Sequence, residues 1–205
     1  MINKIPPLFE YSRYKELIAR FDSHQPERML EIGVWKGDRA EMCLSLGRRL
    51  VEYVGFDLFD EMTDQCHESE GMGNCFAQPL DAVRSRLLEK KREHTTLRLV
   101  KGDTQVTLPA FLASSKVKYD FVFVDGGHSC DTIASDWRYV SQLLAVQGVC
   151  IFDDYYLETD AIGAKMLVDH LDTEVWARDF FQAITLTPEG HYVTMVAVSR
   201  RNNPT

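Results

Sequence analysis

The sequence predicts an α/β fold with a doubly wound, mainly parallel sheet, helices on both faces and an antiparallel hairpin at the C-terminal end. Three observations lead to this prediction. Apolar runs of strand length alternate with segments of helical periodicity. Five successive strand-like runs end at or shortly before an acidic residue. Two late runs flank a turn-forming stretch. No repeat, low-complexity tract or linker is evident, so we expect one domain over 1–205.

The first part of the chain predicts two helix–strand pairs. Residues 8–21 carry apolar side chains at helical spacing, which gives one apolar face within an N-terminal helical cap over 1–27. Residues 28–32 form a short apolar run that we interpret as the first strand. A helix should follow over 38–49, and residues 53–56 form the second predicted strand.

The middle of the chain continues the alternation. A charged segment over 80–94 predicts a helix, and residues 97–100 predict the third strand. A short helix is expected over 107–114. The fourth strand, over 121–124, is apolar throughout, which is typical of a strand covered on both faces. The helix predicted over 131–144 has a single apolar stripe.

The last part of the chain completes the sheet. Residues 149–152 predict the fifth strand, and a helix is expected over 161–171. Two late runs, over 181–186 and 192–199, flank the turn-forming residues 187–190. This pattern indicates a hairpin that closes the sheet.

Composition and charge narrow the class of protein. The net charge of -8 and the sequence pI near 5.2 argue against a nucleic-acid or membrane partner. No apolar run is long enough to span a bilayer, and the N-terminus lacks the apolar run of a signal peptide. The five cysteines are odd in number and form no C-x-x-C pair, so we expect neither disulfides nor zinc, and a cytoplasmic location.

Acidic residues gather at one edge of the predicted sheet. In a parallel sheet the ligand crevice lies beyond the carboxyl ends of the strands. Helix capping would explain a single carboxylate at such a strand end. It does not easily explain a carboxylate after each of five consecutive strands. The acidic residues at these strand ends are Glu31, Asp57, Asp103, Asp125, Asp153 and Asp154.

The loop after the first predicted strand is a candidate ligand site. Gly33 permits backbone torsions that other residues avoid, so a ligand can approach the main chain there. The amides that start the following helix would face that ligand. We include Val34 and Gly37 among the binding residues of this loop, and we predict that Asp125, after the fourth predicted strand, contacts the same ligand. The alternative is a plain strand-to-helix turn.

Two further strand ends complete a predicted nucleotide site. A carboxylate at Asp57 can accept hydrogen bonds from both hydroxyls of a ribose. Asp103, followed by Thr104, stands where it can accept the amino group of an adenine. The alternatives are a helix cap or turn at Asp57 and a turn residue at Asp103.

Through these acidic and glycine residues after successive strands, the stretch 28–154 resembles the class I S-adenosylmethionine-dependent methyltransferases, whose fold is Rossmann-like. The resemblance implies that Glu31 and Gly33 hold the methionine portion of S-adenosylmethionine. It also implies that Asp57 binds the ribose and that Asp103 lies beside the adenine.

Trp35 marks a departure from that family. The common glycine-rich motif has three glycines at alternate positions, and this tryptophan replaces the middle one. The residue is therefore also a candidate for the wall of an acceptor pocket, together with Tyr155 and Tyr156. Packing in the core is the alternative for all three aromatic side chains.

Three carboxylates, Asp125, Asp153 and Asp154, follow neighbouring predicted strands. Without partners they would repel one another, and a divalent cation removes that cost. All-oxygen ligands favour Mg²⁺. The arrangement is similar to the metal-dependent O-methyltransferases of the catechol and sugar-modifying types. That resemblance implies that the three bind Mg²⁺, which would hold two substrate oxygens and lower the pKa of one. The alternative is that Asp153 and Asp154 cap a turn.

His128 is the candidate general base. It lies three residues after Asp125 on a glycine-rich loop, and histidine titrates near neutral pH. A histidine at the matching place is the base in some sugar O-methyltransferases, and the resemblance implies the same role here. A hydrogen-bonding loop residue is the alternative. We expect the segment 60–79 to form a lid over the site, with a surface excursion as the alternative.

These predictions point to an S-adenosylmethionine-dependent methyltransferase that acts on a hydroxyl of a small molecule such as a sugar, a phenol or another natural product. An N-methyltransferase and a non-catalytic S-adenosylmethionine-binding protein are the alternatives. A nicotinamide-dependent oxidoreductase fits less well, because the G-x-G-x-x-G turn is absent. The apolar face of 8–21 would pack on its own sheet or on a second subunit of a homo-oligomer.

Overall fold

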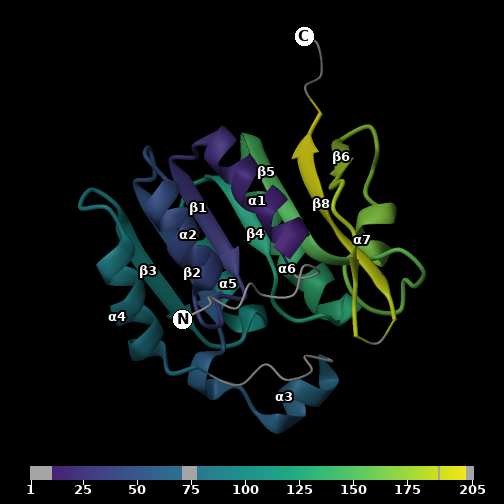
Figure 1. Cartoon of the computed structure of the whole chain (residues 1–205), viewed down its shortest axis with the longest axis horizontal. Coiled ribbons are helices and arrows are strands. Elements are labelled where there is room, and N and C mark those ends of the chain that lie inside the picture. Colours follow the sequence, from purple (N-terminus) through teal and green to yellow (C-terminus); the bar gives the residue numbers. More distant parts are fainter. Residues whose placement is uncertain (1–10, 71–77, 189, 202–205) are drawn as a thin grey trace, which may run out of the picture.

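The computed structural model describes residues 11–70, 78–188 and 190–201, and it confirms the α/β class (Figure 1). The described sheet runs in the order β3-β2-β1-β4-β5-β8-β6, and β7 pairs with β8 beside this path. In chain order the elements are α1 (Tyr11–His24), β1 (Arg28–Ile32), α2 (Asp38–Leu46), β2 (Glu52–Asp57), η1 (Phe59–Glu61), α3 (Asp64–Ser69), α4 (Leu80–Lys90), β3 (Thr96–Lys101), α5 (Thr104–Ser114), β4 (Tyr119–Val124), α6 (Cys130–Leu143), β5 (Leu144–Tyr156), α7 (Lys165–Asp169), β6 (Trp176–Phe180), β7 (Thr185–Leu186) and β8 (Tyr192–Arg200).

The centre of the sheet is parallel, as predicted. β1 pairs with β2 on one side and with β4 on the other, and β3 and β5 extend the parallel part outward. The chain therefore winds away from β1 in both directions, which opens a crevice at the carboxyl ends of the strands. The last strands are antiparallel, since β8 runs against β5 and β6 runs against β8.

Helices cover both faces of the sheet (Figure 1). Buried side chains of α1, α2 and α4 form one core with the sheet, and those of α5, α6 and α7 form the other. β4 shows why one strand serves both cores. Phe121 and Phe123 belong to the first, whereas Val122 and Val124 belong to the second, because successive side chains of a strand point to opposite faces.

Helix boundaries differ from the prediction where local capping decides them. α5 begins at Thr104, three residues early, because the Asp103 side chain accepts a hydrogen bond from the Gln105 amide (2.8 Å) and caps the helix. α2 ends at Leu46, before the predicted limit of 49, and Gly47 follows as its C-cap. The helix predicted over 161–171 is wrong in length, because α7 spans only Lys165–Asp169.

The C-terminal hairpin is only partly as predicted. β8 matches the run 192–199, but its longer antiparallel partner is β6. The sequence pattern does not indicate β6, because Arg178 and Asp179 break the apolar run. Within 181–186, Thr185–Leu186 forms the strand β7 beside β8, and the Phe181 amide donates to the Met195 carbonyl of β8 (3.0 Å). The edge position of β6 explains the charged residues, since an edge strand is less buried than a central one.

The predicted lid segment contains folded elements. η1 and α3 lie within or next to 60–79, near the carboxyl ends of β1 and β2 (Figure 1). Lys101 ties η1 to β3 through an ion pair with Asp60 (2.9 Å). The Thr63 side chain caps α3 by accepting a hydrogen bond from the Cys66 amide (3.2 Å). Residues 71–77 of the predicted lid lie outside the described residues.

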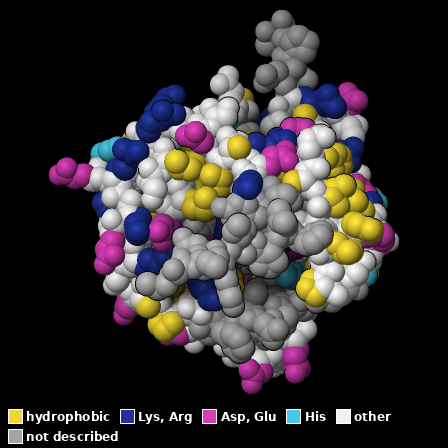
Figure 2. Space-filling model, viewed as in Figure 1, with side chains coloured by type: hydrophobic (Ala, Val, Ile, Leu, Met, Phe, Trp, Pro, Cys, Tyr) yellow, Lys and Arg dark blue, Asp and Glu magenta, His cyan; other side chains and the backbone are white. Residues whose placement is uncertain are grey.

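Within the described ranges, no helix combines the length and apolar character needed to cross a membrane. The four cysteines described there, Cys43, Cys66, Cys130 and Cys150, are free thiols. On the face shown in Figure 2, basic side chains are interspersed with acidic ones among the coloured residues.

Candidate functional site

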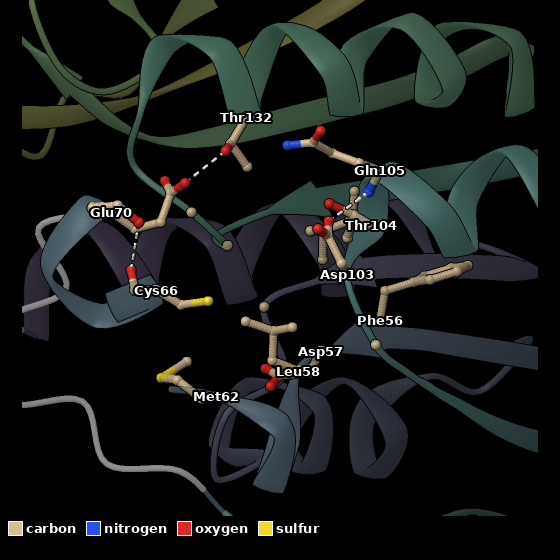
Figure 3. A pocket seen from close by; sticks show the side chains of 16 residues that line it. Phe56, Asp57, Leu58, Met62, Cys66, Glu70, Asp103, Thr104, Gln105 and Thr132 are labelled. Atoms are coloured by element: carbon tan, nitrogen blue, oxygen red, sulfur yellow. Dashed lines mark hydrogen bonds between the residues drawn. The ribbon is translucent and has the colours of Figure 1, made fainter. Parts of the chain in front are cut away.

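A cleft opens at the carboxyl edge of the sheet, between the ends of β1 and β2, the segment that carries α3, and the starts of α5 and α6 (Figure 3). Its lining combines apolar side chains such as Phe56 and Leu58 with a few polar groups, which is typical of a small-molecule site. Predicted cofactor residues line it: Gly33, Asp57, Asp103 and Thr104. The cleft is also lined by Leu58, after β2, and by four residues of the predicted lid segment that the sequence analysis did not name as binding residues: Met62, Cys66, Ser69 and Glu70.

The loop between β1 and α2 is shaped by close backbone contact. Gly33 has φ of 87°, and its amide donates to the Phe56 carbonyl (2.9 Å). A Cβ atom at Gly33 would lie only 1.8 Å from the Asp125 carbonyl oxygen. Gly37, with φ of 82°, is the N-cap residue of α2. The ends of β1 and β4 can therefore meet only because position 33 has no side chain, which is a structural requirement beside its predicted binding role.

Asp57 holds the same loop in place. Its Oδ2 accepts a hydrogen bond from the Trp35 amide (2.7 Å), and its Oδ1 accepts one from the Phe59 amide (2.6 Å). Burial raises the pKa of Asp57, and the backbone hydrogen bonds oppose that shift. Each carboxylate oxygen has a second lone pair, so the carboxylate can also accept hydrogen bonds from ribose hydroxyls.

Asp103 and Thr104 meet the cleft at the start of α5. The hydrogen bond from the Gln105 amide occupies Oδ1 of Asp103, so this oxygen has a structural role as the N-cap of α5. The residue is exposed and lines the cleft, so capping and ligand binding are compatible.

Four predicted cofactor residues lie outside the cleft lining: Asp125, which is also a predicted metal ligand, and Val34, Gly37 and Glu31. Val34 and Gly37 are buried against the α2 and α4 side of the sheet. Glu31 is 1% exposed, and the Tyr53 hydroxyl donates a hydrogen bond to its carboxylate. Burial raises the pKa of Glu31 to about 7, which the hydrogen bond from Tyr53 opposes. Contact of these residues with the methionine portion stays a prediction.

The three predicted metal ligands come together. Asp125, Asp153 and Asp154 each offer an oxygen, and these oxygens lie within 4.8 Å of one another. Asp153 and Asp154 belong to β5 rather than to the loop after it, so the predicted strand over 149–152 is too short. The β5–β8 register shifts between Phe152 and Tyr155, and Asp154 has φ of 55°. Both carboxylates therefore approach Asp125 although they are adjacent in sequence.

The electrostatics of this acidic trio fit a divalent cation. Burial, followed by repulsion from Asp153 and Asp154, raises the pKa of Asp125 well above its usual range. Burial also raises the pKa of Asp153. Three clustered carboxylates are the all-oxygen donor set that hard divalent ions prefer, and in this structure Arg13 and His128 supply the positive charge beside them. The residues present therefore suit the predicted metal.

His128 faces the trio directly. Its Nε2 lies 3.0 Å from Asp154 Oδ2. Burial lowers the pKa of the imidazole, but the hydrogen bond to Asp154 outweighs it and raises the value to about 9. The same contact lowers the pKa of Asp154 against the opposing effect of burial. In this arrangement His128 carries a proton at neutral pH and must lose it before it can act as a base.

Arg13 and Tyr14 of α1 also reach the trio, and the sequence analysis did not identify them. Arg13 Nη1 lies 3.2 Å from Asp153 Oδ1, and the Tyr14 hydroxyl donates to Asp153 Oδ2 (2.6 Å). Sequence offers little signal for these roles. Tyr14 fits the apolar face of its helix, and an arginine beside such a face is usually solvated.

Glu70 joins α3 to the start of α6. Its carboxylate accepts hydrogen bonds from the Ser129 amide (2.8 Å), the Ser129 hydroxyl (3.1 Å) and the Thr132 hydroxyl (2.7 Å). Figure 3 shows Glu70 reaching across one end of the cleft to Thr132. The positive end of the α6 dipole favours this carboxylate. Sequence spacing gives no indication of a contact between residues 59 positions apart.

The three predicted substrate residues are placed as follows. Tyr155 is buried, its hydroxyl donates to Asp169 Oδ1 on α7 (2.8 Å), and its ring packs against Phe180. Tyr156 is partly buried, and its ring lies 5.9 Å from that of His191. Trp35 is partly buried, with Lys36 Nζ 4.2 Å from its ring centroid. Their contact with an acceptor stays a prediction.

Comparison with known proteins identifies a matching family and solved structures of similar fold. A family model described as "Methyltransferase domain" matches residues 30–155. A search of curated protein sequences finds no significant relative. Among solved structures, an O-methyltransferase from Bacillus cereus in complex with SAH has a TM-score of 0.64 at 14% identity, with 97% of this chain and 84% of that chain covered.

Two further structures show how widely the fold is used. The O-methyltransferase TomG from Streptomyces achromogenes, involved in tomaymycin synthesis and solved with SAM, has a TM-score of 0.63 at 17% identity, covering 91% of this chain and 79% of its own. An rRNA methylase from Streptococcus thermophilus has a TM-score of 0.64 at 12% identity, covering 93% and 98%. At such identities the likeness shows a shared fold, and these proteins differ in what they act on.

Proposed function

Because this chain belongs to the methyltransferase-domain family, we propose that it transfers a methyl group from S-adenosylmethionine to a hydroxyl of a small molecule. One observation carries the proposal. Gly126 and Gly127 line the cleft, and Asp125, the residue before them, belongs to the acidic trio. A cofactor in the cleft and an acceptor at the trio would therefore be neighbours, and proximity of the reacting groups is the main requirement for methyl transfer.

The cleft supplies the cofactor-binding residues of the proposal. Asp57 would accept the ribose hydroxyls through the lone pairs that its backbone contacts leave. Asp103 and Thr104 would lie beside the adenine, and Gly33 would let the methionine portion approach the backbone.

The trio supplies the acceptor end. Asp125, Asp153 and Asp154 would hold Mg²⁺ or a similar ion, which when bound supplies Lewis-acid stabilisation of an ionised acceptor oxygen. His128 would take the proton of the acceptor hydroxyl at Nε2, the nitrogen that faces Asp154. It can do so only from its neutral form, so the contact with Asp154 must weaken in the active state.

A hydroxyl on a small molecule fits the chain better than RNA. The net charge of -8 opposes binding of a polyanion. Two neighbours of the same fold are described as O-methyltransferases, one of them in the synthesis of a natural product. N-methylation and non-catalytic binding of S-adenosylmethionine remain the competing hypotheses, and neither requires the trio or His128.

The test is a methyl-transfer screen over hydroxylated metabolites, run with Mg²⁺ and with chelator. We expect Asp153→Asn and His128→Ala to lower kcat by roughly 10²-fold or more. Asp179→Asn is the matched control, because Asp179 is an exposed carboxylate of β6 that pairs with Arg20 away from the trio. Wild-type rates in both site variants would refute the metal-and-base mechanism. S-adenosylmethionine binding without turnover of any acceptor would favour the non-catalytic hypothesis.

A further inference from the structure

The first turn of α1 places two side chains into the acidic trio. Arg13 Nη1 lies 3.2 Å from Asp153 Oδ1 and 3.7 Å from Asp154 Oδ1. The Tyr14 hydroxyl lies 2.6 Å from Asp153 Oδ2 and 3.4 Å from Asp125 Oδ2. One helix thus brings a cation and a hydroxyl to the same three carboxylates.

These two side chains are largely enclosed by the protein. The side chain of Arg13 is 13% exposed, and the Arg39 guanidinium stacks on the Tyr14 ring at 3.9 Å. Further along α1, Leu17 and Phe21 are buried in the core between helix and sheet. Glu16 accepts hydrogen bonds from the Gln182 amide (3.0 Å) and the Ala183 amide (3.1 Å). α1 is therefore anchored behind its first turn as well as at the trio.

The chemistry of the two side chains matches that of the two ligands expected there. A guanidinium between two carboxylates neutralises the charge that a divalent cation would otherwise neutralise. A phenolic hydroxyl that donates to a carboxylate of the trio resembles the hydroxyl of an acceptor. The cation needs the carboxylate oxygens that α1 uses in this structure, and an acceptor held by that cation needs the space beside them.

Resting on the proposed function, we propose that the first turn of α1 is an internal competitor, in which Arg13 occupies the place of the divalent cation and Tyr14 that of the acceptor hydroxyl. The site is loaded when this turn withdraws from the trio. Leu17 and Phe21 keep the rest of α1 on the sheet, so withdrawal involves the start of the helix and not the whole element.

Metal binding tests the Arg13 half of the proposal without an assay of turnover. Mn²⁺ is titrated into wild-type protein and Arg13→Gln, and free Mn²⁺ is followed by electron paramagnetic resonance. We expect Arg13→Gln to bind Mn²⁺ about tenfold or more tightly, because it removes a competing unit charge at contact range. Arg20→Gln is the matched control, since Arg20 lies on the same helix and pairs with Glu16 and Asp179 instead. Equal affinity of Arg13→Gln and wild type would overturn the proposal.

Hydrogen exchange distinguishes displacement of the first turn of α1 by the cation from simple charge repulsion between Arg13 and the cation. In wild-type protein, saturating Mn²⁺ should speed exchange of the amides of residues 15–18, which bond the carbonyls of the first turn, by several fold and leave the amides from Phe21 onward protected. Unchanged protection of the whole helix in the metal-bound protein would overturn displacement, even if Arg13→Gln binds more tightly. Melting curves in chelator check that Arg13→Gln is folded, and Arg13→Lys, which keeps the charge, should retain wild-type Mn²⁺ affinity within about threefold.

Tyr14→Phe tests the second half of the proposal, in which Tyr14 occupies the place of the acceptor hydroxyl. It keeps the ring that stacks on Arg39 and removes the hydroxyl that holds the first turn to Asp153. At a Mn²⁺ concentration about tenfold below the wild-type Kd, where the turn still occupies the trio of most wild-type molecules, a catechol probe should therefore bind Tyr14→Phe several fold more tightly than wild type. No gain in catechol affinity at that Mn²⁺ concentration would refute the role of Tyr14. Binding of S-adenosylmethionine is measured in parallel. If S-adenosylmethionine binds and the α1 variants behave as wild type, the competitor proposal alone fails. If S-adenosylmethionine does not bind, the proposed function fails.

Discussion

Gly33 illustrates how one residue can be fixed by structure and by function together. Its positive φ and the 1.8 Å approach of a Cβ atom to the Asp125 carbonyl exclude any side chain. The same position joins the cofactor cleft to the strand that ends at the acidic trio. A substitution there should therefore disturb folding and both halves of the site.

We predict that Gly33→Ala lowers the free energy of unfolding by more than about 3 kcal/mol, because torsional strain adds to a backbone clash. Gly190→Ala is a matched control. Gly190 also has a positive φ, of 92°, but nothing lies within 4 Å of its Cβ position, so only the torsional cost of about 1 kcal/mol applies. Denaturant unfolding measures both, and equal losses would show that the contact with Asp125 is not limiting.

Asp136 is a buried acid that the proposed mechanism does not use. It is 1% exposed, and the Thr104 side chain is the neighbour that favours its ionised form. Burial raises the pKa of Asp136 to about 7. The folded state therefore holds this proton over a pH range in which the unfolded chain has lost it.

The sign of the pH dependence follows from that difference. Between the ordinary value of 3.8 and about 7, the folded state binds more protons at Asp136, so stability falls as pH rises, by up to about 4 kcal/mol. Asp136→Asn should flatten this decline, as measured by urea unfolding from pH 4 to 8. Asp131→Asn, an exposed change on the same helix, should leave it intact. An unchanged slope in Asp136→Asn would contradict the assignment.

At the scale of elements, α3 and α6 form one wall of the cleft through Glu70. We predict that Glu70→Gln weakens binding of S-adenosylmethionine about tenfold, because it removes charge-assisted hydrogen bonds to Ser129 and Thr132 that hold α3 beside the cleft. Glu68→Gln on the exposed side of α3 is the control. Calorimetry measures both, and equal affinities would show that α3 contributes nothing to cofactor retention.

The regular elements were predictable where periodicity is strong and packing agrees with it. β1, β2, β4 and β8 lie close to their predicted ranges, because each is an apolar run. β6 was missed because an edge strand tolerates Arg178 and Asp179, and α7 is short because Gly163 turns the chain before it, with φ of 78°. Sequence indicated the acidic edge, since strand ends can be read locally. It did not indicate Arg13, Tyr14 or Glu70, because their partners lie 59 or more positions away.

At the scale of the whole molecule, the edge of one sheet carries the cleft and the acidic trio, which adjoin each other at Asp125 and Gly126. A ligand that binds only the folded state stabilises it by RT ln(1 + [L]/Kd), which is about 2.7 kcal/mol at a hundredfold excess over Kd. S-adenosylmethionine and Mg²⁺ should therefore each raise Tm, since the cleft and the trio use different side chains.

The rise in Tm caused by S-adenosylmethionine and the rise caused by Mg²⁺ should respond differently to chelator and to single substitutions. Differential scanning calorimetry measures both rises. Chelator should abolish the Mg²⁺ increment and keep that of S-adenosylmethionine, and Asp153→Asn should do the same. Asp57→Asn should reduce the cofactor increment and keep that of Mg²⁺, because Asp57 lines the cleft and lies outside the trio. Loss of both increments in either variant would mean that the two halves of the edge do not bind independently. The cleft and the trio would then have to be treated as one site that forms only when cation and cofactor are both present.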